Sequence, residues 1–546
     1  MAGADEWGEG RDDGGAAGAG GGLRLRSSDD IQGNVLAGFS KDHQVFMFLS
    51  FGGARGQDRA QDRAQAGARS WLAELTRPPG GRIATTRQVA RFNDRFREER
   101  RRLGSQPLGS QPLGRGDPPD LKAVWVNLGL TCSGLLTLHP ELERQLDGYE
   151  AFRQGASGRR TDEYGDTTTT AALLGDEGDS GPEGWVIGGP AGEPVDALVT
   201  VAADREDELL GRVAEERARA RRAGLTVLLE QRGDTLPGER RGTEHFGFRD
   251  GISQPGIRGF TRAVVRRGRE EDADHPGSPV IAAGEFVLGE VGERGHGLAA
   301  RRRAAPRWMR DGSFQVFRRL LQDVPGWRAE VQRLRGPSMT AEALGAKVVG
   351  RWPDGTPLAP ARGRRGSNDF DYGDDQEGYH TPRFAHIRKT NPRSDEVFGD
   401  RAHRILRRGI PFGPPLDPGA AGDRWAHAER GLLFNAFMAS IEDQFEFVQR
   451  NWVNNPLFPS VPLDAGRLRD AAVDGHDPLI GVGSHPCVLR GGGQRDRPLD
   501  FRRFVRTTGA VYAFAPSLEA LRALARPGPL RAHGDLPPRS EPLTWR

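Results

Sequence analysis

The sequence predicts an α+β fold, on three observations. Short apolar runs typical of strands alternate with segments of helical periodicity through the first half of the chain. The second half repeats this alternation, and 546 residues are enough for more than one domain. Each half could therefore form an antiparallel sheet with helices packed on one face. We expect the boundary between the halves near residue 240.

The first half begins with a glycine-rich, acidic stretch, residues 1–25, which we expect to be a disordered tail. The N-terminal domain is then expected over residues 26–240. Its expected strands are residues 45–51, 121–130, 197–203 and 226–231. Its expected helices are residues 57–77, a helix capped by Thr131, and a charged helix that Asp204 caps and that ends near Arg222. Residues 99–119 contain a duplicated LGSQP motif and are expected to form a loop.

The second half, residues 241–530, is expected to form the C-terminal domain. Its predicted elements are a strand over residues 285–289, a strand that passes into a helix over residues 313–324, a strand near Leu432 followed by a helix ending near Trp452, and a strand over residues 510–516 followed by a capped helix. The arginine-rich residues 261–275 have the character of an insertion.

Composition excludes several classes of protein. The formal net charge is only +3, so there is no global attraction to nucleic acid or to an anionic membrane. No apolar run reaches the roughly 18 residues of a membrane span. The N-terminus lacks the features of a secretory signal. Cys132 and Cys487 have no spacing typical of a disulfide framework, a zinc site or covalent haem attachment. A cytoplasmic protein is therefore expected.

Residues His245 to Pro255 read HFGFRDGISQP and place Asp250 next to Gly251. The simplest interpretation is a tight turn, because aspartate tolerates turns and glycine adopts backbone angles that other residues avoid. The alternative is a carboxylate presented to a bound group. The motif alone does not decide between them.

Two further stretches could contribute to a site. His386 lies in RFAHIRKTNPR, where Arg388, Lys389 and Arg393 could bind the carboxylates of an anionic ligand. A single histidine is nevertheless more often a surface or core residue than a ligand. Arg407 follows two apolar residues in RILRRGIPFG, which favours a guanidinium near an apolar surface, although a solvated arginine is the simpler interpretation.

The three motifs HFGFRDGISQPGI, FAHIRKTNPR and ILRRGIPFG together resemble those of the dye-decolorizing peroxidases. Further similar motifs follow in the same order from about Asp30 to Arg522, including DIQGNVLAGFSKDH and GLLFNAFMASIEDQFEFVQRNWVNNPLFP. The sequence is most similar to the longer cytoplasmic-type members. The resemblance implies two ferredoxin-like halves, with non-covalent haem b in the C-terminal half.

The resemblance also implies site residues. His386 would be the proximal iron ligand, Asp250 the distal acid–base residue and Arg407 the distal arginine. Leu432 and Phe434 would cover the open face of the iron, and Arg388 is expected among the cofactor-binding residues. Such a site would reduce hydrogen peroxide and oxidise a dye or another small-molecule donor, without nucleic acid or membrane partners. An oligomer is possible but cannot be inferred from the sequence.

Several alternatives remain open from the sequence. A metal-bound imidazole usually donates its second nitrogen to a carboxylate or carbonyl, and Glu442 and Glu446 are candidates for that acceptor. Trp452 could carry electrons to bulky dyes from the surface, although core packing is the simpler role. The chain could also carry haem, or handle its iron, without catalysis. A third possibility is a haem-free interaction module in which Asp250 is only a turn residue.

Overall fold

The computed structural model describes residues 23–52, 58–77, 81–102, 121–161, 165–293, 305–362, 367–394, 400–416, 428–459, 474–482, 486–491, 495–528 and 530. The predicted tail lies outside them as far as residue 22, but its last residues do not fit the prediction. Arg24–Ser27 form a 3-10 helix (η1) in which Leu25 is buried. The predicted loop over residues 99–119 lies largely outside the described residues, and its first residues belong to helix α3 (Thr86–Arg102).

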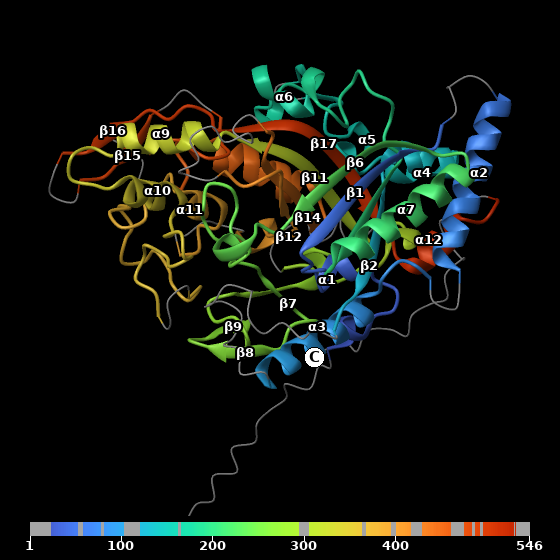
Figure 1. The fold of residues 1–546 in the computed structure, drawn as a ribbon, viewed down its shortest axis with the longest axis horizontal. Helices are drawn as coiled ribbons and strands as arrows, with labels where there is room; N and C mark the ends of the chain where they lie inside the picture. Colours follow the sequence, from blue (N-terminus) through green and yellow to red (C-terminus); the bar gives the residue numbers. More distant parts are fainter. Residues whose placement is uncertain are drawn as a thin grey trace, which may run out of the picture.

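One nine-stranded antiparallel sheet forms the centre of the molecule (Figure 1). Its strand order is β12-β14-β11-β17-β2-β5-β1-β6, and β13 also pairs with β14. The strands are β1 (His43–Ser50), β2 (Val124–Leu130), β5 (Ala197–Ala203), β6 (Thr226–Asp234), β11 (Ser313–Gln322), β12 (Leu406–Arg407), β13 (Ile410–Phe412), β14 (Gly431–Met438) and β17 (Val505–Ala515).

The same strand order occurs in both halves of the chain. The first half contributes β2-β5-β1-β6 and the second contributes β12-β14-β11-β17. In each case the sheet order is second, third, first and fourth along the chain, which is the order of a ferredoxin-like unit. The two units meet where β17 pairs with β2, at Phe514 and Leu130. The predicted α+β class is therefore confirmed, with the strands of both halves joined in one sheet.

Helices of the first half and the C-terminal helix cover one face of this sheet, on the right of Figure 1. They are α2 (Asp58–Thr76), α4 (Cys132–Leu138), α7 (Glu206–Arg222) and α12 (Leu518–Leu524). Their apolar side chains share a core with alternate residues of the strands. At the left of the view lie α9 (Val324–Leu334), α10 (Ala341–Val349) and α11 (His386–Thr390).

The other face of the sheet is concave and packs mainly on itself. Phe46 of β1 belongs to one buried cluster with Phe317 of β11 and Leu433 of β14, two neighbouring strands that are distant from β1 in the sheet order. The two ends of the sheet also approach each other. A Cβ at Gly233 of β6 would lie 2.5 Å from Ile410 of β13. Glycine at this position therefore allows the close approach.

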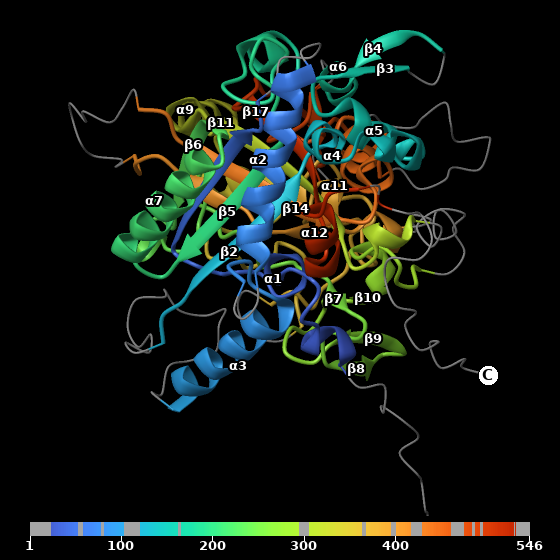
Figure 2. The same ribbon diagram turned by 90° about the vertical axis from the view of Figure 1, so that its right-hand side faces the viewer.

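Smaller elements complete the described structure. They are α1 (Gly33–Leu36), α5 (Glu150–Gln154), α6 (Thr170–Leu174), two π-helical segments (Ile441–Glu446 and Val448–Val453), and the strand pairs β3 (Arg159–Thr161) with β4 (Thr167–Thr169), β7 (Gly256–Ile257) with β10 (Val280–Ile281), β8 (Ala263–Arg266) with β9 (Arg269–Asp272), and β15 (Cys487–Leu489) with β16 (Arg497–Leu499). Figure 2 shows β8 and β9 at the end of the molecule opposite β3 and β4. The predicted insertion at residues 261–275 is thus a β-hairpin with a following turn.

Two local predictions are wrong. Asp204 does not cap α7, because its carboxylate binds Lys41 and the residue before the helix is Arg205. Residues 285–289 are not a strand. Ala283–Glu285 form a 3-10 turn, and the carbonyl of Glu285 accepts from the backbone of Ala439 and the side chain of Gln444.

None of the described helices combines the length and the apolar character that crossing a membrane would require. Cys132 and Cys487 are both buried free thiols. Burial raises the pKa of the Cys132 thiol to about 11 and that of Cys487 to about 12. Both thiols are therefore protonated at neutral pH.

Candidate functional site

Segments from distant parts of the chain enclose a cavity of about 280 Å³. One wall comes from the loop after β6, which carries Asp250, and a second comes from α11, which begins at His386. Strands β12 and β14 and the π-helical segments complete it. Of the six predicted site residues, five line this cavity: His386, Asp250, Arg407, Leu432 and Phe434.

His386 is oriented by a buried carboxylate. Its Nδ1 lies 2.7 Å from Oδ2 of Asp477, and Asp477 is 0 % exposed. The second carboxylate oxygen of Asp477 accepts from the backbone N–H of Leu479 at 2.8 Å. Burial lowers the pKa of His386, but Asp477 raises it by more, so the pKa lies above the ordinary value. With Nδ1 bound in this way, Nε2 is the nitrogen available to the cavity.

The prediction that Glu442 or Glu446 accepts from His386 is wrong. Glu442 instead accepts from the backbone N–H of Ala151 at 2.6 Å. Glu446 accepts from the Tyr512 hydroxyl, and burial raises the pKa of Glu446 to about 7. Asp477 is 91 residues beyond His386. It lies in a loop, so no helical or strand spacing in the sequence connects the two residues.

Asp250 and Arg407 form an ion pair at the cavity. Nη1 of Arg407 donates to Oδ1 of Asp250 at 2.8 Å. The backbone N–H of Gly251 donates to the same oxygen at 2.6 Å, and Gly251 has a positive φ of 75°. Burial raises the pKa of Asp250, but Arg407, the Gly251 N–H and His386 together lower it by more, so the pKa lies below the ordinary value. The lowered pKa keeps Asp250 as a carboxylate. The turn predicted from the sequence places this carboxylate at the cavity.

The neighbouring residues hold Arg407 in place. Its Nη2 donates to the carbonyl of Ser253 at 3.1 Å. Gln254 pairs with its backbone twice, since Nε2 of Gln254 donates to the Arg407 carbonyl at 3.0 Å and Oε1 accepts from the Arg407 N–H at 3.3 Å. The side chain of Gln254 thus extends the edge of β12, and the loop that carries Asp250 also fixes the backbone of Arg407.

Leu432 and Phe434 alternate along β14 with residues of the other face. Both are partly exposed and line the cavity, whereas Leu433 between them is fully buried in the concave core. This alternation follows from the period of two in a strand. Phe434 also packs against Phe445 of the first π-helical segment, with ring centroids 5.7 Å apart. The cavity therefore has an apolar wall next to its charged one.

The chain is similar to known proteins over most of its length. Residues 296–457 match the family model "Dyp-type peroxidase, C-terminal". The chain is 29 % identical over 534 residues to the dye-decolorizing peroxidase msp1 of Mycetinis scorodonius, an alignment that covers 91 % of this chain and 87 % of that protein. It is 34 % identical over 335 residues to the multifunctional dye peroxidase DyP2 of an Amycolatopsis species, covering 56 % and 66 %. A structure of a variant of the dye-decolorizing peroxidase from Pleurotus ostreatus superposes with a TM-score of 0.69 at 27 % identity, covering 91 % and 99 %.

The chain belongs to the dye-decolorizing peroxidase family. The resemblance noted in the sequence is thereby confirmed. As a member of this haem-dependent family, the chain is a hydrogen-peroxide-dependent oxidoreductase.

Arg388 is the predicted site residue that the structure places elsewhere. It is 0 % exposed and does not line the cavity. Its guanidinium donates to the carbonyls of Asp375 and Thr381, and it lies 4.5 Å from the ring centre of Tyr372. The expectation that Arg388 binds the cofactor is therefore corrected, because its guanidinium donates to backbone carbonyls of the loop before α11.

Two arginines that line the cavity were not identified as site residues from the sequence. Arg351 was not singled out, and Arg393 was named only as one of several basic residues. Both pack against Phe370, at 5.1 and 3.9 Å from its ring centre. Among the described residues, neither forms an ion pair with a carboxylate within 4.0 Å. Burial, together with the nearby charge of Arg393, lowers the pKa of Arg351 to about 10.

Proposed function

We propose that this chain is a non-covalent haem b peroxidase in which His386 binds the iron and in which Asp250 and Arg407 act on hydrogen peroxide. The observation that carries the proposal is the arrangement of one cavity. Helix α11 contributes a carboxylate-bound imidazole to it, and a different wall contributes the Asp250–Arg407 ion pair. A protein that only carries haem needs the imidazole but has no use for this pair.

The residues present fit haem b. A histidine that donates one ring nitrogen to a carboxylate is the usual arrangement of a metal-bound imidazole. Leu432 and Phe434 offer an apolar surface for a flat macrocycle. Arg351 is buried and Arg393 is half-buried, and neither has a carboxylate partner among the described residues. Charges withdrawn from water in this way are stabilised by a counter-charge. Haem b would supply the iron that receives the two oxidising equivalents of peroxide, and its two carboxylates would supply that counter-charge.

Asp250 is proposed to move the proton. Hydrogen peroxide must lose a proton from one oxygen and gain one on the oxygen that leaves as water. One positioned group can act first as the base and then as the acid. Asp250 begins this cycle as a carboxylate because Arg407 and the Gly251 N–H keep its pKa low. Its side chain is 37 % exposed and lines the cavity, so it is accessible to a small molecule there.

Arg407 is proposed to stabilise the negative charge that develops as the O–O bond breaks. A fixed cation in a site from which water is excluded is more effective than one in bulk solvent. Arg407 is fixed through Ser253 and Gln254, so it does not have to reorganise during the reaction.

The electron donor is proposed to be a dye or a phenol-type small molecule. The names of the relatives mention dyes, and one similar structure is a dye-decolorizing peroxidase in complex with 2,6-dimethoxyphenol. A cytoplasmic location and a division of the chain into residues 26–240 and 241–530 also remain proposals. The repeated strand order supports the division.

The test is an absorption spectrum of the purified chain before and after hydrogen peroxide, followed by dye turnover. We expect a Soret band, a rapid spectral change with peroxide and sustained dye oxidation. His386→Ala should lose the Soret band. A Soret band that does not respond to peroxide would favour a haem carrier, and no Soret band after expression with ample haem would favour a haem-free module.

A further inference from the structure

A loop that does not itself line the cavity joins the two cavity arginines to each other. Oδ1 of Asn368 accepts from Nη2 of Arg351 at 2.9 Å and from Nη2 of Arg393 at 2.6 Å. One neutral oxygen is therefore shared by two guanidinium groups of like charge. Asn368 is only 7 % exposed, so water does not screen this contact well.

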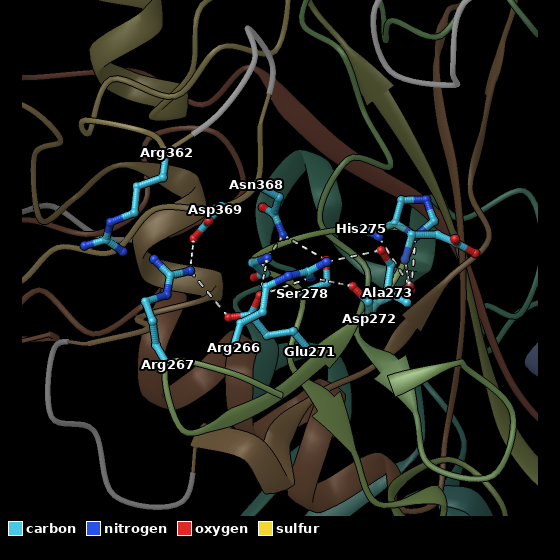
Figure 3. Close-up of polar contacts among 12 residues, drawn as sticks. Arg266, Arg267, Glu271, Asp272, Ala273, His275, Ser278, Arg362, Asn368 and Asp369 are labelled. Atoms are coloured by element: carbon cyan, nitrogen blue, oxygen red, sulfur yellow. Dashed lines mark hydrogen bonds and ion pairs between the residues drawn. The ribbon is translucent and has the colours of Figure 1, made fainter. Parts of the chain in front are cut away.

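The other end of the same amide is anchored to the base of the β8–β9 hairpin. Nδ2 of Asn368 donates to the Ser278 hydroxyl at 3.0 Å and approaches the Gly277 carbonyl at 3.4 Å. Figure 3 shows Asn368 beside Asp369 of the same loop, with its amide directed toward Ser278 of this turn. Because Oδ1 faces two donors and Nδ2 faces two acceptors, the orientation of the amide is determined by its surroundings.

The turn at Gly277 and Ser278 allows the backbone of Asn368 to approach closely. Gly277 has a positive φ of 78°, and a Cβ there would lie 2.2 Å from the backbone oxygen of Asn368. Ser278 is 0 % exposed. The hairpin is tied to the same segment by a second link, because Arg267 forms an ion pair with Asp369 (Figure 3). The β8–β9 hairpin with its following turn and the loop of residues 367–371 therefore form one packed unit behind the two arginines.

An amide is suited to this position. A carboxylate in place of Asn368 would cancel one of the two positive charges of Arg351 and Arg393 and reduce their attraction for an anion in the cavity. An apolar residue would leave two guanidinium groups without the acceptor that holds them side by side. The neutral oxygen of Asn368 orients both groups and leaves their charge available.

We propose that Asn368 is a positioning residue that orients Arg351 and Arg393 to bind the carboxylates of the cofactor. This inference rests on the proposed function, because it takes haem as the ligand of the cavity. It also gives a role to the turn after the β8–β9 hairpin, since Ser278 and Gly277 hold the amide in place.

The experiment compares two cofactors that differ only at the carboxylates. The full chain is loaded with haem or with haem dimethyl ester, and the transfer of each to an excess of a haem-scavenging apoprotein is timed by absorbance. The variants are Asn368→Ala and, as a matched control in the same loop, Asp369→Ala. Asp369 binds Arg267 but neither cavity arginine.

We expect Asn368→Ala to release haem about tenfold faster than the parent, the size of effect typical for a hydrogen bond to a charged group. Asp369→Ala should release haem at the parental rate. With the dimethyl ester, Asn368→Ala and the parent should release the cofactor at equal rates, because the ester carries no charge for the arginines to bind. A general loss of packing would instead accelerate the release of both cofactors.

A second variant gives an independent check. Asn368→Asp should also release haem faster, because its carboxylate competes for both arginines, while the thermal stability of the cofactor-free chain should not fall. The inference is overturned if Asn368→Ala retains haem as the parent does, or if it accelerates the release of haem and ester alike. A parent chain that takes up no haem at all would overturn the proposed function, and this inference with it.

Discussion

Nδ1 of His386 lies 2.7 Å from Oδ2 of Asp477, so an imidazole at the start of α11 is hydrogen-bonded to a fully buried carboxylate 91 residues further along the chain. A carboxylate in this position orients the ring and increases the basicity of the nitrogen that faces the cavity. Asp477 is in turn held by the backbone N–H groups of Leu479 and Ile480. The orientation of His386, the proposed iron ligand, therefore depends on a loop far from it in sequence.

Asp477→Asn is expected to weaken haem binding by about 10- to 100-fold, the range typical for the loss of such an outer partner. The reduction potential of the iron should rise, because a less basic imidazole stabilises the ferric state less. Transfer of haem to a scavenger and a spectroelectrochemical titration measure the two effects. Glu442→Gln is the matched control and should change neither, since Glu442 binds Ala151 instead. Equal effects of the two variants would contradict the role of Asp477.

Arg407→Leu is expected to retain haem but to slow the reaction with peroxide by about 10²- to 10³-fold, the usual loss when one preorganised donor to a developing anion is removed. Stopped-flow absorbance at limiting peroxide measures this step. Arg401→Leu is a suitable control, because Arg401 lies six residues earlier and binds Glu293 outside the cavity. An unchanged peroxide step in Arg407→Leu would show that the arginine has been assigned the wrong role.

Asp250→Asn should slow the same step, and the double variant with Arg407→Leu should be slower by less than the product of the two single effects. When two residues act together, the free-energy effects of substituting each of them are not additive. The ion pair at 2.8 Å predicts this coupling. Fully multiplicative effects in the same stopped-flow measurement would indicate that the two residues act independently.

The pH dependence of the peroxide step should follow Asp250. The base is active when it is deprotonated, and its pKa is lowered, so the rate should be constant from neutral pH into the acid range and fall only as Asp250 becomes protonated. In Arg407→Leu the raising effect of burial is no longer opposed by the arginine. The acid limb should then move toward neutral pH by about one unit or more. A rate that rises steadily from acid to pH 8 would exclude Asp250 as the base.

The local part of the site was predictable from the sequence. Asp250 lies in a turn whose glycine has the expected positive φ, and Leu432 and Phe434 face the cavity because a strand alternates its side chains. These features depend only on residues close in the chain. The strands of the central sheet were likewise visible as apolar runs, and β5 (Ala197–Ala203) has the predicted bounds.

The remaining features depend on contacts between distant residues. Asp477 and Arg351 reach the site through loops, and no spacing connects either of them to His386. The apolar run that contains Phe286 and Leu288 predicted a central strand, and both side chains are indeed fully buried. The segment nevertheless begins with a 3-10 turn, whose Glu285 carbonyl accepts from Gln444 of the first π-helical segment. An apolar run alone does not distinguish these cases. The role of Asp204 was not predictable either, because its carboxylate binds Lys41, a residue 163 positions away in the chain.

Trp452 is expected to act in the core and not as a surface site for dyes. Its side chain is only 3 % exposed, and it stacks on Phe458 with ring centroids 5.0 Å apart. Trp452→Phe should therefore oxidise a bulky dye at the parental rate, whereas Trp452→Ala should lower the free energy of unfolding by about 3–5 kcal/mol. Dye turnover and chemical denaturation of the holoprotein measure the two effects. His403, which lines the cavity, lies 5.4 Å from the ring centre of Trp452. If Trp452→Phe lost the oxidation of bulky dyes but kept that of a small phenol, the tryptophan would be part of an electron path, and the packing role alone would be wrong.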